Sequence, residues 1–289
     1  MLNEKSSSQK KDIRIYDSES QFPPIKEYIN DTLAHLRFAY EKAKLDLRAM
    51  NKNTWLGQLW NILNPLLLSL VYWLLVVVIF GTGGSIFDRE GLRILTQIVG
   101  GLFLYAFISN GLTLGAGSIV GGGAFVLNTR LPRMILPLSA ICSAVISFLP
   151  SMIVYAAFHA VSSHPVGIQM LWSIPIFLIL FSLTLGLSML AATGNVYFRD
   201  IASFLPYVIR IWLYLTPIIY LYTDPPATLD WVLYLNPIGT TFAAWQQILY
   251  EGNSPSLKFL LVGIMWSILF LVTGLLMFLR KEREFAIRI

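Results

Sequence analysis

The chain has 289 residues, of which 56% are hydrophobic and only 13% are charged, and its mean hydropathy is +0.65. A soluble globular domain is about 45–50% apolar and about 25% charged, so this composition excludes an ordinary soluble protein. The formal net charge of +5 does not indicate a nucleic-acid partner, because membrane proteins concentrate Lys and Arg in their cytosolic loops. The single cysteine, Cys142, excludes a disulfide framework and a paired-cysteine metal site.

The first fifty residues divide into two parts. Residues 1–24 are polar and poor in apolar side chains, which predicts a disordered cytosolic tail. Residues 25–50 carry apolar side chains at steps of three and four with charged residues between them, which predicts an amphipathic helix. The apolar stripe consists of Ile25, Ile29, Leu33, Leu36, Tyr40, Ala43 and Leu47. We expect this helix to lie in the membrane interface; a helix packed on a soluble partner is the alternative.

Six apolar runs of about twenty residues follow, the length that crosses a hydrocarbon core about 30 Å thick. They are residues 62–80, 94–114, 134–160, 171–193, 204–222 and 257–279. Pro137 and Pro150 predict that the third run is kinked or begins outside the bilayer. Residues 230–250 are also hydrophobic, but Asn236-Pro237-Ile238-Gly239 divides them into pieces too short to span, which predicts re-entrant or surface half-helices. The predicted fold is therefore all-α and polytopic: an interface helix, then a six-helix transmembrane domain over residues 51–289.

The distribution of positive charge predicts the orientation. With six spans, only three of the 21 Lys and Arg residues fall in the loops opposite the termini, namely Arg89, Arg93 and Lys258. The positive-inside rule therefore places both termini in the cytosol. A seventh span would move the basic C-terminal segment, residues 280–283, to the outside.

Glycine pairs four residues apart occur where the second span is expected to end. Gly111 and Gly115 form one such pair, and Gly117 and Gly121 form another. Small residues at this spacing let two helices approach closely in lipid, so we expect both pairs to pack against a neighbouring helix.

The sequence lacks the common catalytic motifs. It has no GxxxxGK[ST] segment for ATP and no HExxH segment for zinc, and His159 and His164 are five residues apart rather than the four of a helical metal pair. The predicted spans contain no Asp or Glu, which counts against a proton- or sodium-coupled carrier. We therefore expect no catalytic residue, metal or cofactor in this chain.

Polar and aromatic side chains within the first and fifth spans are candidates for a substrate pathway. Arg210 either meets an anionic substrate group or extends to the cytosolic interface, and the residues leave both readings open. Aromatic rings suit the apolar faces of sugars, whereas an ordinary interfacial belt is the alternative. The candidate pathway residues are Tyr72, Trp73, Tyr207, Arg210, Trp212 and Tyr214.

Four segments resemble one family when taken together. They are residues 55–65 (WLGQLWNILNP), 131–137 (LPRMILP), 195–201 (NVYFRDI) and 235–238 (LNPI). In order and spacing, from about residue 25 to the end, they are similar to the membrane permease subunit of type-2 ABC exporters for polysaccharides, O-antigen and teichoic acids. The sequence departs from the family after the NP motif, where Ala244-Trp245-Gln246-Gln247 replaces a segment that often carries an arginine.

The resemblance implies a homodimer in the bacterial cytoplasmic membrane, joined to two copies of a cytosolic ABC ATPase that bind ATP and Mg²⁺. It implies that a glycan linked to polyprenyl pyrophosphate moves from the cytosol through a channel between the two permeases. A permease for drugs or lipids of the same superfamily is one alternative, and an ATP-independent carrier is another.

The resemblance also implies two groups of site residues. Coupling to the ATPase would involve Asn128, Thr129, Arg130, Leu131, Pro132 and Arg133, with Arg199 and Asp200 near the same surface. An outer gate would include Trp231, Tyr234, Asn236, Pro237 and Trp245.

Overall fold

The computed structural model describes residues 25–50, 52, 54–79, 89–129, 131–162 and 166–289, and every regular element in these ranges is helical. The α-helices are α1 (Ile25–Ala34), α2 (Leu36–Met50), α3 (Trp60–Leu74), α4 (Arg89–Gly121), α5 (Gly123–Asn128), α6 (Ile135–Val161), α7 (Ser173–Tyr197), α8 (Asp200–Leu215), α9 (Asp230–Leu235), α10 (Gly239–Leu249) and α11 (Leu257–Arg288). A π-helical turn, Leu75–Ile79, extends α3. The tail predicted at residues 1–24 lies outside the described ranges.

Five helical stretches in the described residues are long and apolar enough to cross a membrane. They are Gly57–Val77, Gly91–Gly121, Ile135–Val161, Ile168–Tyr197 and Leu257–Arg288. They coincide with five of the six predicted spans, and the chain is a polytopic membrane protein. The third of them runs as one helix with Pro150 inside it.

The predicted span at residues 204–222 is not a single helix. Helix α8 has 16 residues and ends at Leu215, because Thr216 is extended, with φ −102° and ψ 136°. Thr216 precedes Pro217, and the proline ring disfavours the helical conformation in the residue before it. Residues 216–226 then continue as turns. The boundary of this span was therefore wrong, although the helix itself was predicted.

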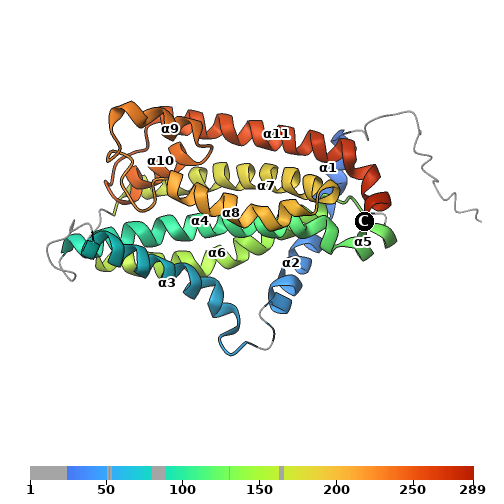
Figure 1. The fold of residues 1–289 in the computed structure, drawn as a ribbon, viewed down its shortest axis with the longest axis horizontal. Helices are drawn as coiled ribbons and strands as arrows, with labels where there is room; N and C mark the ends of the chain where they lie inside the picture. Colours follow the sequence, from blue (N-terminus) through green and yellow to red (C-terminus); the bar gives the residue numbers. More distant parts are fainter. Residues whose placement is uncertain (1–24, 51, 53, 80–88, 130, 163–165) are drawn as a thin grey trace, which may run out of the picture.

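The long helices form one elongated bundle. Figure 1 shows α4, α6, α7, α8 and α11 running along its length with α3 inclined beside them. Helices α9 and α10 lie at one end, whereas α1, α5 and the C-terminus lie at the opposite end. The predicted break at Asn236 is confirmed, since α9 ends at Leu235 and α10 begins at Gly239.

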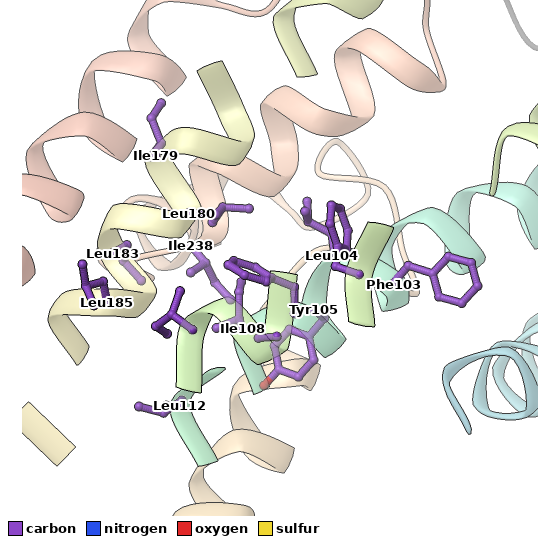
Figure 2. Close-up of a cluster of buried hydrophobic side chains, with 14 of the residues drawn as sticks. Phe103, Leu104, Tyr105, Ile108, Leu112, Ile179, Leu180, Leu183, Leu185 and Ile238 are labelled. Carbon is purple, nitrogen blue, oxygen red and sulfur yellow. The ribbon is translucent and has the colours of Figure 1, made fainter. Parts of the chain in front are cut away.

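The centre of the bundle is a cluster of buried apolar side chains between α4 and α7 (Figure 2). It includes Phe103, Leu104, Tyr105, Ile108 and Leu112 of α4, Ile179, Leu180, Leu183 and Leu185 of α7, and Ile238 from the turn before α10. Lipid tails are as apolar as these side chains, so the cluster holds the helices together by close packing rather than by removal from water.

Glycines allow α4 to approach α7 closely. A Cβ atom added at Gly115 would lie 1.8 Å from the Ser188 hydroxyl oxygen, and one at Gly111 would lie 2.9 Å from a Thr184 methyl carbon. The packing predicted for this pair is confirmed. The second pair was predicted wrongly, because a Cβ atom at Gly117 or Gly121 would meet nothing within 4 Å among the described residues.

Helices α7 and α11 touch through their backbones. A Cβ atom added at Gly274 would lie 2.3 Å from the Gly186 carbonyl oxygen, and one at Gly186 would lie 2.3 Å from the Phe270 backbone. No side chain larger than hydrogen fits at this crossing without moving a helix.

The predicted interface helix is two helices, α1 and α2, separated at His35. Its apolar stripe divides between two environments. Ala43 and Leu47 are buried against α6, and the Ser143 hydroxyl donates to the Ala43 carbonyl over 3.3 Å. Leu33 and Leu36, by contrast, are 53% and 42% exposed. The stripe therefore anchors α2 to the bundle through Ala43 and Leu47 and leaves Leu33 and Leu36 able to meet lipid or protein.

Candidate functional site

Four of the predicted pathway residues share one outward surface, formed by α3 and α8. The Tyr72 and Tyr214 hydroxyls are hydrogen-bonded over 3.1 Å, and their rings stand perpendicular with centroids 6.2 Å apart. Tyr207 and Arg210 lie two turns and one turn before Tyr214 on α8, and all three are exposed. We call Tyr72, Tyr207, Arg210 and Tyr214 the aromatic face.

The two predicted tryptophans point elsewhere. Trp73 is buried, and its indole N–H donates to the Gly91 carbonyl over 2.7 Å, which ties α3 to the start of α4. The Trp212 indole donates to the Asn236 side-chain oxygen over 2.7 Å. These placements favour a packing role for Trp73 and a link to the α9–α10 turn for Trp212, rather than contact with a substrate.

Asn236 is the centre of the α9–α10 turn. Its side-chain oxygen accepts from the Trp212 indole and from the Ile238 backbone N–H, over 2.7 and 3.2 Å. Its amide nitrogen donates to the Leu215 carbonyl and the Thr216 hydroxyl, each over 3.0 Å. Both hydrogens and both lone pairs of the amide are thus used. The residue fastens the predicted gate to the C-terminal end of α8.

The other predicted gate residues divide between the surface and the core. Trp231 is exposed, and the Pro237 ring is partly buried. The Tyr234 ring lies 4.3 Å from the Lys258 ammonium, and its carbonyl accepts from the Trp266 indole over 3.0 Å, so α9 is held on α11. Trp245 is buried beside Tyr155, with ring centroids 6.2 Å apart.

Gln246 is a structural residue of this end that the sequence reasoning did not assign. Its amide nitrogen donates to the carbonyls of Pro217 and Tyr220, each over 2.9 Å, and its oxygen accepts from the Tyr222 N–H over 2.9 Å. The amide binds both carbonyl and N–H groups, which an arginine cannot do because it has no acceptor. A buried amide within an apolar helix was the available signal.

The predicted coupling residues lie at the opposite end of the bundle. Asn128, at the end of α5, and Thr129 are both exposed, and the Thr129 hydroxyl donates to the Phe125 carbonyl. Leu131 is partly buried and Pro132 is buried. Arg130 lies outside the described residues. We call residues 128–133 the coupling loop. Arg199 and Asp200 are exposed where α8 begins.

Asn195 positions that start of α8. Its amide nitrogen donates to the Ala116 carbonyl of α4 over 2.9 Å, and its oxygen accepts from the Ala202 N–H over 3.3 Å. The bend between α7 and α8 is therefore fixed to α4, which leaves Arg199 and Asp200 on the surface.

Arg133 is bound to the end of α11 instead of being free on the surface. Its backbone N–H donates to the Glu282 carboxylate over 2.9 Å, and its guanidinium donates to the Glu282 carbonyl. The Tyr28 hydroxyl of α1 hydrogen-bonds to the same carboxylate and accepts from the Met134 N–H over 3.2 Å. Burial raises the pKa of Tyr28, and the Glu282 charge and hydrogen bond raise it further, so the hydroxyl stays protonated.

The described residues contain no group of three or more His, Cys, Asp or Glu side chains placed to hold a metal ion. His159 is buried on α6 with its ring 3.4 Å from the Tyr155 hydroxyl. His164 lies outside the described ranges. The described residues therefore form a helical bundle with the hydrogen-bonded α9–α10 turn at one end, the coupling loop at the other, and the aromatic face on α3 and α8.

Known proteins resemble the chain over most of its length. An O-antigen export system permease protein RfbA of Klebsiella pneumoniae is 28% identical over 244 residues, which are 83% of this chain and 90% of that protein. A second Klebsiella pneumoniae protein of that name is 26% identical over 245 residues, with the same coverage. One from Myxococcus xanthus is 29% identical over 251 residues, 83% of this chain and 91% of its own.

The sequence profile of the ABC-2 type transporter family matches residues 43–250, which are well over half of the chain. The resemblance predicted from the four motifs is confirmed. A permease of this kind is a non-catalytic transmembrane subunit that pairs with an ABC ATPase. The chain therefore belongs to the ABC-2 type transporter family.

Proposed function

We propose that the chain is the membrane subunit of an ATP-driven exporter that moves a polysaccharide linked to polyprenyl pyrophosphate out of the cytosol. The cargo would be of the O-antigen or teichoic-acid type, and the membrane would be the bacterial cytoplasmic membrane. The names of the three relatives, which the chain matches over about nine-tenths of their length, support this cargo class.

The aromatic face carries the proposal. Arg210 is exposed on α8 within an apolar helix, and exposing an arginine to lipid at the bilayer centre costs about 2.5–3.5 kcal/mol on insertion scales. A surface with this arginine and three tyrosines is therefore better suited to water or protein than to lipid. Tyrosine rings and hydroxyls suit sugar faces and rims, and a guanidinium suits phosphate oxygens.

A second copy of the chain would cover this face. In the proposed homodimer, α3 and α8 of each protomer line a channel between the two copies. Helix α8 is about 24 Å long at helical rise, so residues 216–222 would complete a sixth crossing. Both termini would then lie in the cytosol, as the distribution of Lys and Arg also predicts.

Two ATPase subunits would bind at the end of the bundle that carries the coupling loop. ATP and Mg²⁺ would be held by those subunits. The exposed Asn128, Thr129, Arg199 and Asp200 would meet them. At the opposite end, α9 and α10 would form the outer gate.

Reconstitution tests the proposal. The chain is co-expressed with the ABC ATPase encoded beside its gene, purified, and placed in vesicles with a polyprenyl-pyrophosphate-linked glycan. We expect co-purification and ATP-dependent transfer of the glycan, which is lost when the P-loop lysine of the ATPase is replaced. A chain that purifies as a stable monomer, with no ATPase bound or required, would refute the proposal. Equal transfer of lipids or drugs without a glycan would favour a permease of that alternative class.

A further inference from the structure

We infer that Glu282 is a positioning residue that fixes the coupling loop to the end of α11, so that a force on the loop is delivered to that helix. The inference rests on the proposed function, since it assumes that the loop meets an ATPase. Two of its residues, Tyr28 and Glu282, lie outside the four family motifs, at the two ends of the described chain.

The need for such a residue arises at the start of α6. The first N–H groups of a helix have no partner within the helix, and a side chain just before it usually accepts from one of them. In the part of the chain that the structure describes, the residue in that position, Met134, makes no side-chain cap. The Ile135 and Leu136 N–H groups bond to the Pro132 and Arg133 carbonyls of the loop, over 3.1 and 3.0 Å, so the N–H groups that need other acceptors are those of Arg133 and Met134 just before the helix.

Two other segments supply acceptors for the Arg133 and Met134 N–H groups. The Glu282 carboxylate of α11 accepts from the Arg133 N–H over 2.9 Å, and the Tyr28 hydroxyl of α1 accepts from the Met134 N–H over 3.2 Å. A carboxylate also suits the positive end of the α6 dipole. Bonds to a charged acceptor are stronger than bonds between neutral groups, so Glu282 is the principal of the two.

A return contact closes the arrangement. The Arg133 guanidinium donates to the Glu282 backbone carbonyl, six residues before α11 ends at Arg288. Each of the two residues therefore binds the other through both its backbone and its side chain. The loop cannot shift along α11 without breaking these bonds together.

Helix α11 continues from this contact to the other end of the molecule (Figure 1). There the Trp266 indole donates to the Tyr234 carbonyl, and the Lys258 ammonium lies over the Tyr234 ring. A single helix therefore touches the coupling loop through Glu282 and the predicted gate through Trp266 and Lys258.

The test uses the complete transporter, with its ATPase, in vesicles. Glu282→Ala removes the acceptor, whereas Glu282→Gln keeps an oxygen for the Arg133 N–H. Glu284→Gln is the matched control, because its carboxylate bonds to Lys281, Arg288 and Tyr197 and lies outside the contact with the loop. The measured quantities are glycan exported per ATP hydrolysed, the amount of assembled complex, and amide hydrogen exchange of Leu131, Arg133 and Met134.

We expect Glu282→Ala to assemble and hydrolyse ATP but to export about tenfold less glycan per ATP. Amide exchange in the loop should be about tenfold faster, which corresponds to a loss of about 1.4 kcal/mol of protection. Glu282→Gln should restore most of the ratio of glycan exported to ATP hydrolysed, and Glu284→Gln should match wild type.

An unchanged ratio and unchanged exchange in Glu282→Ala would overturn the inference. If that variant does not accumulate, Glu282→Gln decides it by the exchange of the Arg133 amide, which should be faster than in wild type because a neutral oxygen is a weaker acceptor than a carboxylate; unchanged exchange would overturn the inference. Failure of the wild-type chain to bind an ATPase would refute the proposed function instead.

Discussion

The side chain of Asn236 joins the C-terminal end of α8 to the α9–α10 turn with four hydrogen bonds, to Trp212, Leu215, Thr216 and Ile238. Truncation would leave several buried polar groups without partners, each of which costs about 1–3 kcal/mol. We expect Asn236→Ala to destabilise the detergent-purified protein by about 2 kcal/mol, measured as a lower midpoint of thermal unfolding. Asn253→Ala, at an exposed loop position, is the control and should leave the midpoint unchanged. Equal midpoints for the two variants would contradict this role.

Substitutions of Trp73 and Tyr207 distinguish a role in packing from a role in transport. The sequence alone predicts that Trp73→Ala lowers export and leaves assembly intact, but the buried indole and its bond to Gly91 now predict loss of folded complex, by about 3–5 kcal/mol. Tyr207 is 65% exposed, so Tyr207→Ala should fold normally and lower export. Size-exclusion profiles and vesicle transport measure the two effects. A normal profile for Trp73→Ala with reduced export would return Trp73 to the pathway.

Residue types predicted the aromatic face but could not predict which aromatic rings belong to it. Tyr72 and Trp73 are adjacent in sequence, yet helical geometry points them in different directions, and only the position of α4 shows which is covered. The coupling loop was likewise placed by its motif. Its bond to Glu282 joins residues 149 positions apart, which no local pattern reveals.

At the scale of helices, glycine substitutions test the close crossings. A methyl group at Gly274 would meet the Gly186 carbonyl oxygen at 2.3 Å, so Gly274→Ala should destabilise by about 1–3 kcal/mol through overpacking. Gly117→Ala is the matched control, because nothing lies within 4 Å of its added carbon among the described residues. It should be neutral or slightly stabilising, since glycine costs a helix about 0.5–1 kcal/mol. Thermal unfolding in detergent measures both, and a stable Gly274→Ala protein would disprove the backbone contact.

The length of the apolar runs predicted most helices, because a helix that crosses a membrane needs about twenty consecutive apolar residues. It failed at α8, where run length continued to residue 222 but Pro217 ended the helix at Leu215. It also failed to show that α2 packs on α6, because a stripe that faces a protein and one that faces lipid have the same periodicity.

At the scale of the whole molecule, the number of crossings decides where the C-terminus lies. Five crossings would place it opposite the N-terminal arm, whereas the bundle holds α1 and the end of α11 together at one end. We expect alkaline phosphatase to be active when fused after residue 224 and inactive when fused after residue 289. Green fluorescent protein should show the reverse pattern. An active phosphatase at residue 289 would contradict both the sixth crossing and the cytosolic C-terminus.

The backbone contact between Gly186 and Gly274 has a consequence for how a passage could widen. Two helices that touch without intervening side chains cannot slide past one another, because each step would drive a carbonyl into the neighbouring chain. Helices α7 and α11 are therefore a fixed frame. Helix α8 lies outside this frame, is held at its two ends by Asn195 and Asn236, and has a largely uncovered outer surface. A passage for bulky cargo would therefore have to open along that outer surface rather than between the two helices of the frame.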